Sequence, residues 1–473
     1  MPAAVASQGY SLRAKLVAGF IVIALILGGG GTPNPITEFL LQLIFALFAI
    51  AWIWLPSRSR DDALRDRWAW VLVVIPLVVP LVQLVPLPPA IWTTLPGRDN
   101  EIAALSLIGE QSRWRPISLS PSRTLASLLA IVPAVFCFYA VARLDLRGRR
   151  LVLGAIVVLA LVSAWLGAVQ LAARGQGFNF YAQHSAGWVT GFQANRNATA
   201  DVLLIGLLAL AGLAAPYFVE AQRRLPLGLT RRTLVILLGG IALFLLVATV
   251  MTGSRAGIAL LAVAMAGCAL SFSVSRSRSR GGVSRITVIL LAAGLLVGLV
   301  AAFTALSQNT AIARVTERFS DLGSSRTQIW EDSWFALKQY WPVGFGMGGF
   351  EPAMFPAEQL EYLDSLVPNR AHNDFLEIGI EAGMLGYAMV LAAAFAVVGL
   401  ALRAWREPGM RGQVVVGLTT LLLITLHSVV DYPLRSMAVA CLSGVAGGLL
   451  VKGRTAQHRS RESRRAKDVR GYA

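Results

Sequence analysis

Cysteine, histidine and acidic residues are scarce in this chain of 473 residues, which has 3 Cys, 4 His and 25 Asp or Glu. Cys137, Cys268 and Cys441 lie in apolar contexts without a C-x-x-C pair, so their spacing predicts no zinc site. We interpret the three cysteines as small packing residues. Lys and Arg together number 42, which gives a net charge of +17. That charge would suit a nucleic-acid partner, unless the basic residues sort by position along the chain.

Long apolar runs are what the sequence has in abundance. Hydrophobic residues make up 56% of the chain, and stretches of membrane-spanning length recur from residue 16 to residue 451. The sequence therefore predicts an all-α integral membrane protein with about twelve transmembrane helices. The first run lacks a small-x-small cleavage site and is followed at once by another, so we interpret it as a span. The predicted spans are 16–33, 36–55, 68–86, 122–142, 151–172, 197–217, 233–251, 256–273, 286–306, 376–402, 414–430 and 436–451.

The basic residues sort to one side of these spans. With the N-terminus in the cytoplasm, the cytoplasmic segments hold 29 Lys and Arg against 8 Asp and Glu, and the remaining segments hold 13 against 17. This positive-inside pattern predicts that both termini are cytoplasmic. It explains most of the net charge as a topology signal. The cytoplasmic segments are 1–15, 56–67, 143–150, 219–232, 274–285, 403–413 and 452–473.

The predicted domain organisation is a polytopic helical domain at 1–451 followed by a basic cytoplasmic tail at 452–473. The tail suits anionic lipid headgroups, and a nucleic-acid role is its alternative. The long connections all fall on the external side, which indicates that the protein works there. The external loops are 87–121, 173–196 and 307–375.

The longest external loop contains an amphipathic helix, "RTQIWEDSWFALKQYWP". Trp330, Trp334, Leu337 and Trp341 recur at helical spacing, which suits either a helix lying in the membrane interface or one packed on other external loops. The following "GFGMGGF" matches G-x-G-x-x-G, but no strand precedes it. We interpret it as a tight loop rather than a nucleotide site.

Charged residues gather where the loop meets the next span, in "RAHNDFLEIGIEAGMLG". The helix is expected to begin near Asn373, so Asp374 and Glu377 occupy first turns that favour anions. Glu377 and Glu381 share a face with Asn373 and are expected to cap the helix and line a helix–helix seam. His372 precedes the helix, and a histidine there offers imidazole acid–base chemistry. Gly379 and Gly383 form a G-x-x-x-G pair that admits a close neighbour.

Several arginines are predicted at the same external depth. Arg255 lies in "TGSRAG", Arg196 in "ANRNATAD" one turn before Asp201, and Arg326 in "SSRTQIW". A guanidinium offers a bidentate fork to phosphate oxygens, so these positions suit a phosphate site. The alternative is a set of arginines that snorkel to the membrane interface. The other external polar residues are Arg370, Asp431 and Arg435.

These motifs resemble the O-antigen ligase and polymerase superfamily. The resemblance is carried by "GSRAG", by R-x-x-x-W from Arg326 to Trp330, by P-x-G-x-G-x-x-x-F at 342–350 and by "AHNDFLEIGIEAGMLG". "WRPISLSPSRT" at 114–124 and "HSVVDYPLR" are similar to its bacterial cell-surface polysaccharide members. The likeness extends through most of residues 87–435.

The resemblance implies a glycosyltransferase of the bacterial inner membrane with a periplasmic active site. Members move a glycan from an undecaprenyl-diphosphate carrier to a hydroxyl of lipid A–core, of a growing polysaccharide or of a protein. By position, Arg255 and Arg326 would bind the donor diphosphate, with Arg196 a looser match, and His372 would act on the acceptor. We expect an inverting reaction without metal or cofactor, and we expect Asp374 and Glu377 either to orient the His372 ring or to tune its basicity. The supporting residues are Arg370, Asn373, Asp374, Glu377, Asp431 and Arg435.

Three alternatives stay open at this point. A chain polymerase or a protein O-oligosaccharyltransferase of the same superfamily would share the donor site and differ in the acceptor. A polysaccharide or lipid transporter would more typically show midplane charges and broken helices. An acidic loop could bind a divalent cation, although a solvated loop is the simpler interpretation. Its residues are Glu351, Glu358, Glu361 and Asp364.

Overall fold

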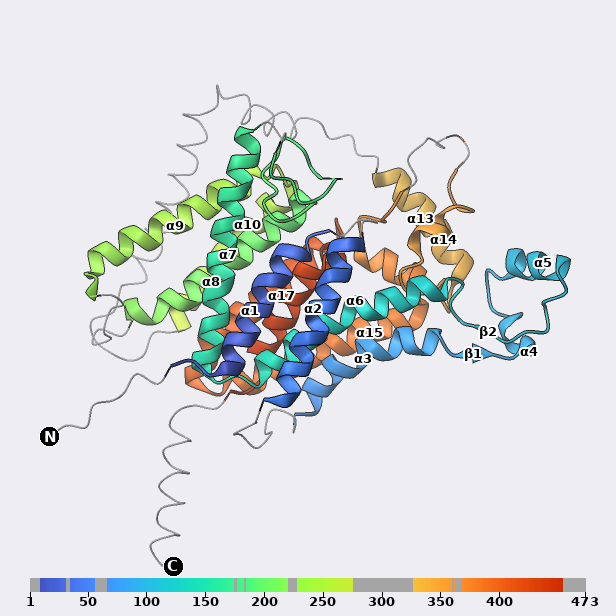
Figure 1. The fold of residues 1–473 in the computed structure, drawn as a ribbon, viewed down its shortest axis with the longest axis horizontal. Helices are drawn as coiled ribbons and strands as arrows, with labels where there is room; N and C mark the ends of the chain where they lie inside the picture. Colours follow the sequence, from blue (N-terminus) through green and yellow to red (C-terminus); the bar gives the residue numbers. More distant parts are fainter. Residues whose placement is uncertain are drawn as a thin grey trace, which may run out of the picture.

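The structure, a computed structural model, is almost wholly helical over the residues that it describes (Figure 1). Within them, the strands are β1 (Pro86–Leu87) and β2 (Arg115–Pro116), which pair antiparallel at the base of a long hairpin. This confirms the all-α class. The described residues are 9–30, 35–55, 66–173, 177–182, 184–219, 228–274, 326–359, 361 and 368–453.

Eleven of the twelve predicted spans coincide with helices, and the twelfth, 286–306, lies outside the described residues. Eight of the described helices are long and apolar enough to cross a membrane, so the count of twelve stays a prediction. The helices that match predicted spans are α1 (Leu12–Leu27), α2 (Pro35–Trp54), α3 (Arg67–Gln83), α6 (Pro121–Ala142), α7 (Leu146–Ala172), α8 (Arg196–Val219), α9 (Arg231–Met251), α10 (Arg255–Val274), α15 (Asp374–Trp405), α16 (Arg411–His427) and α17 (Met437–Leu449).

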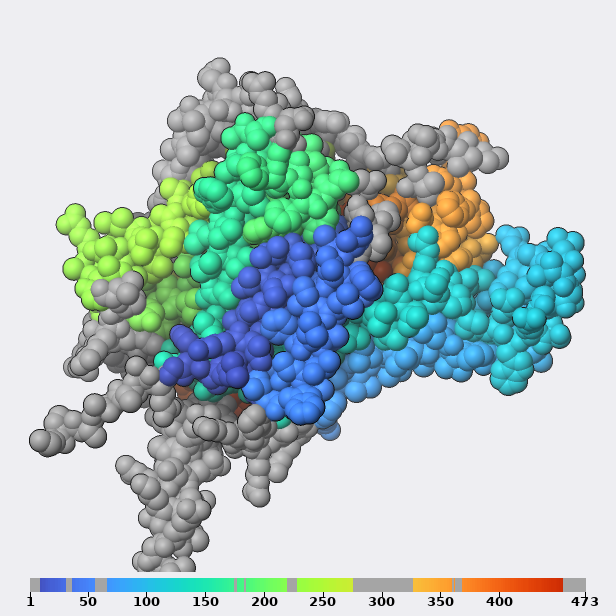
Figure 2. Space-filling model, viewed as in Figure 1, coloured from blue at the N-terminus to red at the C-terminus, as the bar shows by residue number. Residues whose placement is uncertain are grey.

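The shorter elements lie between the spans. One group, α4 (Pro89–Trp92), α5 (Asp99–Leu107) and the β1–β2 pair, projects from the ends of α3 and α6 (Figure 1). Figure 2 shows this hairpin standing clear of the main body on the visible face. The remaining short elements are α13 (Arg326–Tyr340), α14 (Phe350–Met354), η4 (Pro408–Met410) and η5 (Pro433–Arg435).

Helix α17 owes its central place to small residues. An added Cβ on Gly444 would lie 2.1 Å from the Ala134 carbonyl oxygen of α6, and one on Gly448 would lie 2.8 Å from the Phe138 carbonyl oxygen. This small-xxx-small spacing lets two apolar helices approach at backbone distance, where van der Waals packing replaces a hydrophobic driving force. The α6–α17 seam therefore forms one side of the bundle core.

A buried arginine ties together the ends of α6 and α17 that lie away from the His372 segment. Arg149 is fully buried and donates to the carbonyls of Ala142, Leu144, Leu449 and Val451 at 2.8–3.3 Å. A helix leaves its last carbonyls without intrahelical partners, and a cation at that end also complements the helix dipole. One guanidinium therefore satisfies the ends of two helices at once.

Helix α15 is broken near its N-terminal end, at Gly383, whose φ is 53° and ψ is −138°. The break frees the carbonyls of Ile380 and Glu381, which accept hydrogen bonds from the amides of Phe345 and Gly346 at 2.8 Å each. The "GFGMGGF" stretch is thus a tight loop that completes a broken helix, as interpreted from the sequence. Gly344 and Gly346 adopt φ of 88° and 122°, values that side chains other than glycine rarely adopt.

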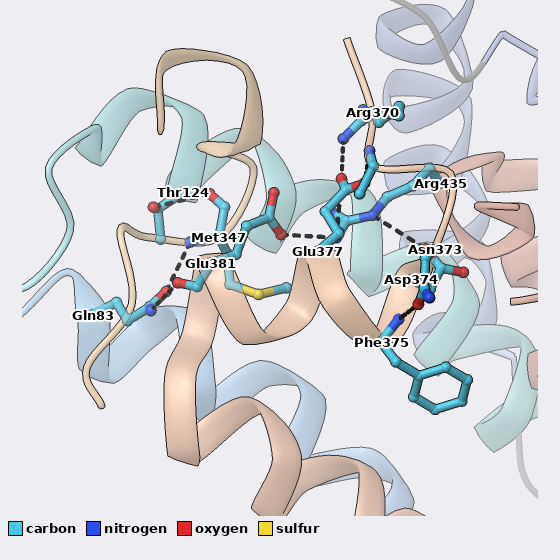
Figure 3. A network of polar contacts seen from close by, with 11 residues as sticks. Gln83, Thr124, Met347, Arg370, Asn373, Asp374, Phe375, Glu377, Glu381 and Arg435 are labelled. Carbon is cyan, nitrogen blue, oxygen red and sulfur yellow. Dashed lines mark hydrogen bonds and ion pairs between the residues drawn. The ribbon is translucent and has the colours of Figure 1, made fainter. Parts of the chain in front are cut away.

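Gln83 at the end of α3 clamps this loop to the break. Its amide nitrogen donates to the Glu381 carbonyl at 2.8 Å, and its amide oxygen accepts from the Met347 backbone at 2.9 Å (Figure 3). Thr124 of α6 adds a hydrogen bond to the Met347 carbonyl at 3.0 Å. The start of α15, residues 374–382, is therefore held in place from three sides.

The amphipathic helix α13 packs on this first part of α15. Trp330 donates from Nε1 to the Ala371 carbonyl at 2.8 Å, and Leu337 is buried in the cluster that also holds Phe350. Trp334 and Trp341 remain exposed. The predicted stripe is therefore only partly buried against the protein. Gly379 serves this packing, because an added Cβ would lie 2.7 Å from the Leu337 side chain.

Candidate functional site

His372 lies directly before α15 and is held by Asp431. Its Nδ1 lies 2.9 Å from Asp431 Oδ1, and its ring centroid lies 4.9 Å from that of Tyr432. The His372 side chain is 26% exposed, whereas that of Asp431 is 3% exposed. With Nδ1–H donating to the carboxylate, Nε2 carries the lone pair and is the ring nitrogen that remains for an incoming group.

The second oxygen of Asp431 is also occupied. Asn197, in the first turn of α8, donates its amide N–H to Asp431 Oδ2. Burial acts to raise the pKa of Asp431, but the hydrogen bond and charge of His372, with the charges of His427 and Arg326, outweigh it and lower the pKa. Asp431 is therefore a fixed anion that faces the imidazole, an arrangement that orients a histidine for proton transfer.

The turn that carries Asp431 receives contacts from several helices. Arg326, the first residue of α13, donates to the Val430 carbonyl. Ser428 donates to the Asp374 carboxylate at 2.8 Å, and the Asp374 amide donates to the Ser428 carbonyl at 2.9 Å. The turn at 427–431 thus joins the beginnings of α8, α13 and α15.

Asp431, rather than Asp374 or Glu377, is the carboxylate that contacts the His372 ring, so the expected orienting contact is made by a different residue. Glu377 accepts from Arg370 Nη1 at 2.8 Å and lies 3.3 Å from Arg435 Nη2, while Arg435 also meets Glu381 at 2.8 Å (Figure 3). Asp374 Oδ1 lies 3.7 Å from Arg435. Opposite charges this close are held together in a buried site, so the arginines draw these carboxylates away from His372.

This ion network supports the backbone segment that carries His372. Burial acts to lower the pKa of the Arg435 guanidinium, but the three surrounding carboxylates outweigh it and raise the pKa. Glu377 also accepts from the Ala371 amide at 3.2 Å, and Asn373 caps α15 by accepting from the amides of Phe375 and Leu376. Glu377 and Glu381 are fully buried in this network, as a polar stripe facing protein requires.

The three arginines predicted to bind a diphosphate share one structural position. Arg196, Arg255 and Arg326 are the first residues of α8, α10 and α13. A helix N-terminus presents free backbone N–H groups and the positive end of the helix dipole, so it favours an anion. Each of these arginines adds a full positive charge at such an end.

Arg196 and Arg255 begin two helices that pack against each other. Helices α8 and α10 touch closely, because an added Cβ on Gly257 would lie 2.5 Å from the Ala200 Cβ. The Arg196 guanidinium lies over the Trp188 ring at 4.8 Å. Arg255 Nε is buried, and it has no hydrogen-bond partner among the described residues. A buried donor without a partner is costly unless a ligand satisfies it.

The structure also reveals partners that the sequence analysis missed. Asn197 and Tyr432 contact the His372–Asp431 pair, and His427 pairs with Asp201 at 2.7 Å within the bundle. The sequence does contain two pairs of polar residues spaced by four positions, 197 with 201 and 427 with 431. This spacing predicts the contacts only once it is known that α8 lies against the end of α16.

Among the described residues, no group of three or more His, Cys, Asp or Glu side chains could hold a metal ion. In the acidic stretch, Glu351 pairs with Arg123 at 2.8 Å. Asp364 lies outside the described residues.

A comparison with curated proteins found no match. A family model described as O-antigen ligase matches residues 240–391. That stretch includes Arg255, Arg326 and His372, together with α13 and the broken start of α15. The chain is therefore a helical membrane protein whose residues 240–391 are similar to the O-antigen ligase family.

Proposed function

We propose that this protein is an O-antigen ligase-like glycosyltransferase that uses an undecaprenyl-diphosphate-linked glycan as its donor. The observation that supports this most is the oriented His372–Asp431 pair in a turn joined to helix N-termini that begin with arginine. A base and an anion site are the two parts that transfer from a diphosphate carrier requires.

In the proposed reaction, His372 Nε2 accepts the proton of the acceptor hydroxyl. The hydroxyl oxygen forms a bond to the anomeric carbon while the bond between that carbon and the diphosphate oxygen breaks. The electron pair of the broken bond leaves on the carrier diphosphate, where Arg255 and Arg326 stabilise the added charge, with Arg196 beside them. Attack opposite the leaving group inverts the anomeric centre, and no metal or cofactor takes part.

Asp431 keeps the His372 ring in the tautomer that leaves Nε2 free and stabilises the imidazolium after proton transfer. Arg370 and Arg435 are already paired with carboxylates. In the proposal they hold the His372 segment and do not bind the donor.

The acceptor decides between the members of the superfamily. Lipid A–core would make the protein a ligase, a growing chain would make it a polymerase, and a protein would make it an O-oligosaccharyltransferase. Deletion of the gene should abolish glycan-capped lipid A–core and leave carrier-linked polymer in place, as gels and mass spectrometry of surface glycans would show. Surviving single repeat units would indicate a polymerase instead. A deletion strain with unchanged surface glycans, carrier-linked pools and glycoproteins would contradict the proposal.

A transporter is the alternative from another class. The break in α15 is a feature of many transporter helices, but it lies at Gly383, nine residues after the helix begins. The surrounding charges are arranged around His372 at the same end of the bundle. An interfacial enzyme therefore fits this arrangement better than a transporter with a site at midplane.

The proposed orientation puts both termini in the cytoplasm and His372 in the periplasm. A Cys placed at the exposed Pro356 of a cysteine-free variant should react with a membrane-impermeant maleimide in intact cells, while one at the exposed Gly409 in η4 should not. Both positions should react after the membrane is lysed. Labelling of Gly409→Cys alone in intact cells would reverse the orientation and remove the site from the periplasm.

A further inference from the structure

Two polar contacts join α8 to the end of α16. We call the Asn197–Asp431 contact the outer rung and the Asp201–His427 contact the inner rung. Asn197 and Asp201 are four residues apart and share one face of α8, as do His427 and Asp431 across the end of α16. Asn197 donates to Asp431 Oδ2, and His427 Nδ1 lies 2.7 Å from Asp201 Oδ1. The outer rung belongs to the proposed site, and the inner rung is one helical turn further into the bundle.

Burial of the inner rung by itself costs the folded state free energy. The side chains of His427 and Asp201 are 0% and 1% exposed, and both lie within helices of the bundle. His427 Nε2 and Asp201 Oδ2 are buried without a hydrogen-bond partner among the described residues. Two apolar side chains of similar size would often stabilise such a place as well or better. An ionisable pair at this depth therefore points to a role beyond stability.

The inner rung is linked to Asp431 through backbone hydrogen bonds. The His427 carbonyl accepts from the backbone amides of Val430 at 3.0 Å and Asp431 at 2.9 Å. A shift of His427 therefore moves the backbone that carries the Asp431 carboxylate. Asp431 in turn holds His372 at 2.9 Å.

We propose that Asp201 and His427 are positioning residues, which hold the last turn of α16 against α8 so that Asp431 meets both Asn197 and His372. This inference rests on the proposed function, in which Asp431 orients the base. The pair acts through its hydrogen bond, which sets the position of the turn that carries Asp431.

Removal of the hydrogen bond should slow the chemical step. In Asp201→Leu and His427→Leu, kcat should fall about 10–100-fold, because misplacement of a catalytic group by about 1 Å has effects of this order. The KM for the donor should stay within about twofold, because the arginines are untouched. Asp201→Asn should keep kcat within about threefold of wild type, because its amide oxygen still accepts from His427 Nδ1.

The assay is the release of undecaprenyl diphosphate from carrier-linked glycan by purified full-length protein, with lipid A–core as acceptor. Thr249→Val is the matched control, since Thr249 is equally buried and donates within α9 at 2.8 Å. Thermal unfolding in detergent checks that each variant is folded. If leucine blocks folding, Asp201→Ser makes the same comparison, because its side chain is too short to reach His427.

Low kcat in the leucine or serine variants, with normal turnover in Asp201→Asn, would support the positioning role. Normal turnover in every variant would overturn it, and loss of activity in Asp201→Asn equal to that in Asp201→Leu would show that charge rather than geometry matters. His372→Ala is measured in parallel to separate the two proposals. If His372→Ala is inactive while the leucine variants are fully active, the positioning role alone fails; if His372→Ala is active, the proposed base fails and the positioning role with it.

Discussion

His372→Ala should lower kcat for glycan transfer by about 10²–10⁴-fold, the usual contribution of a general base. Donor binding should change little, because the alanine variant keeps the arginines and the helix N-termini. The measurement is the initial rate of undecaprenyl diphosphate release by the purified variant. His184→Ala is the matched control. Among the described residues, the hydrogen-bond partner of the His184 ring is the Tyr181 carbonyl, 3.1 Å from Nδ1.

Asp431→Asn is the partner experiment. An amide at this position can donate to His372 Nδ1, which places the ring proton on Nε2 and removes the lone pair from the acceptor. The variant should therefore lose activity to a degree comparable with His372→Ala, although its side chain has almost the same shape. A fully active Asp431→Asn variant would separate Asp431 from the mechanism.

Arg255→Lys and Arg326→Lys should each lower kcat/KM for the donor by about 10–100-fold, which corresponds to the loss of one charge-assisted hydrogen bond. Lysine keeps the positive charge but loses the planar fork that matches two phosphate oxygens. Arg255 is the sharper case, because its buried Nε has no hydrogen-bond partner among the described residues. The measurement is the kinetics of transfer at varied donor concentration.

Arg113→Lys is the control for this series, since the Arg113 side chain is 70% exposed and lies in the hairpin that β1 and β2 close. Arg435→Lys is a useful contrast. Arg435 is committed to three carboxylates, so its replacement should lower the melting temperature in detergent. Full donor kinetics in both Arg255→Lys and Arg326→Lys would indicate that these arginines are interface anchors.

The helices could be predicted because their signals are local. Apolar runs of sufficient length predict spans wherever they occur, and the start of α15 at Asp374 follows from the cap that Asn373 provides. The glycine-rich stretch was recognisable as a loop for the same reason, since no strand precedes it. These inferences need only neighbours along the chain.

The partners of the charged residues could not be predicted in this way. His372 and Asp431 are 59 residues apart, and Asn197 and Asp431 are 234 apart, so their pairing depends on which helices pack together. Asp374 is nearer to His372 in sequence, yet Arg435 and Ser428 hold it. The break at Gly383 likewise depends on the loop at 344–346, which supplies the backbone donors that the broken helix lacks.

The most direct test of the central claim is turnover by purified protein given carrier-linked glycan and lipid A–core, with wild type and His372→Ala compared in the presence and absence of EDTA. We expect wild type to release undecaprenyl diphosphate as the acceptor gains glycan, at the same rate with EDTA, and His372→Ala to release almost none. Near-normal release by His372→Ala would contradict the role of His372 as the base. Loss of wild-type activity in EDTA, with recovery on adding a divalent cation, would contradict the metal-free mechanism.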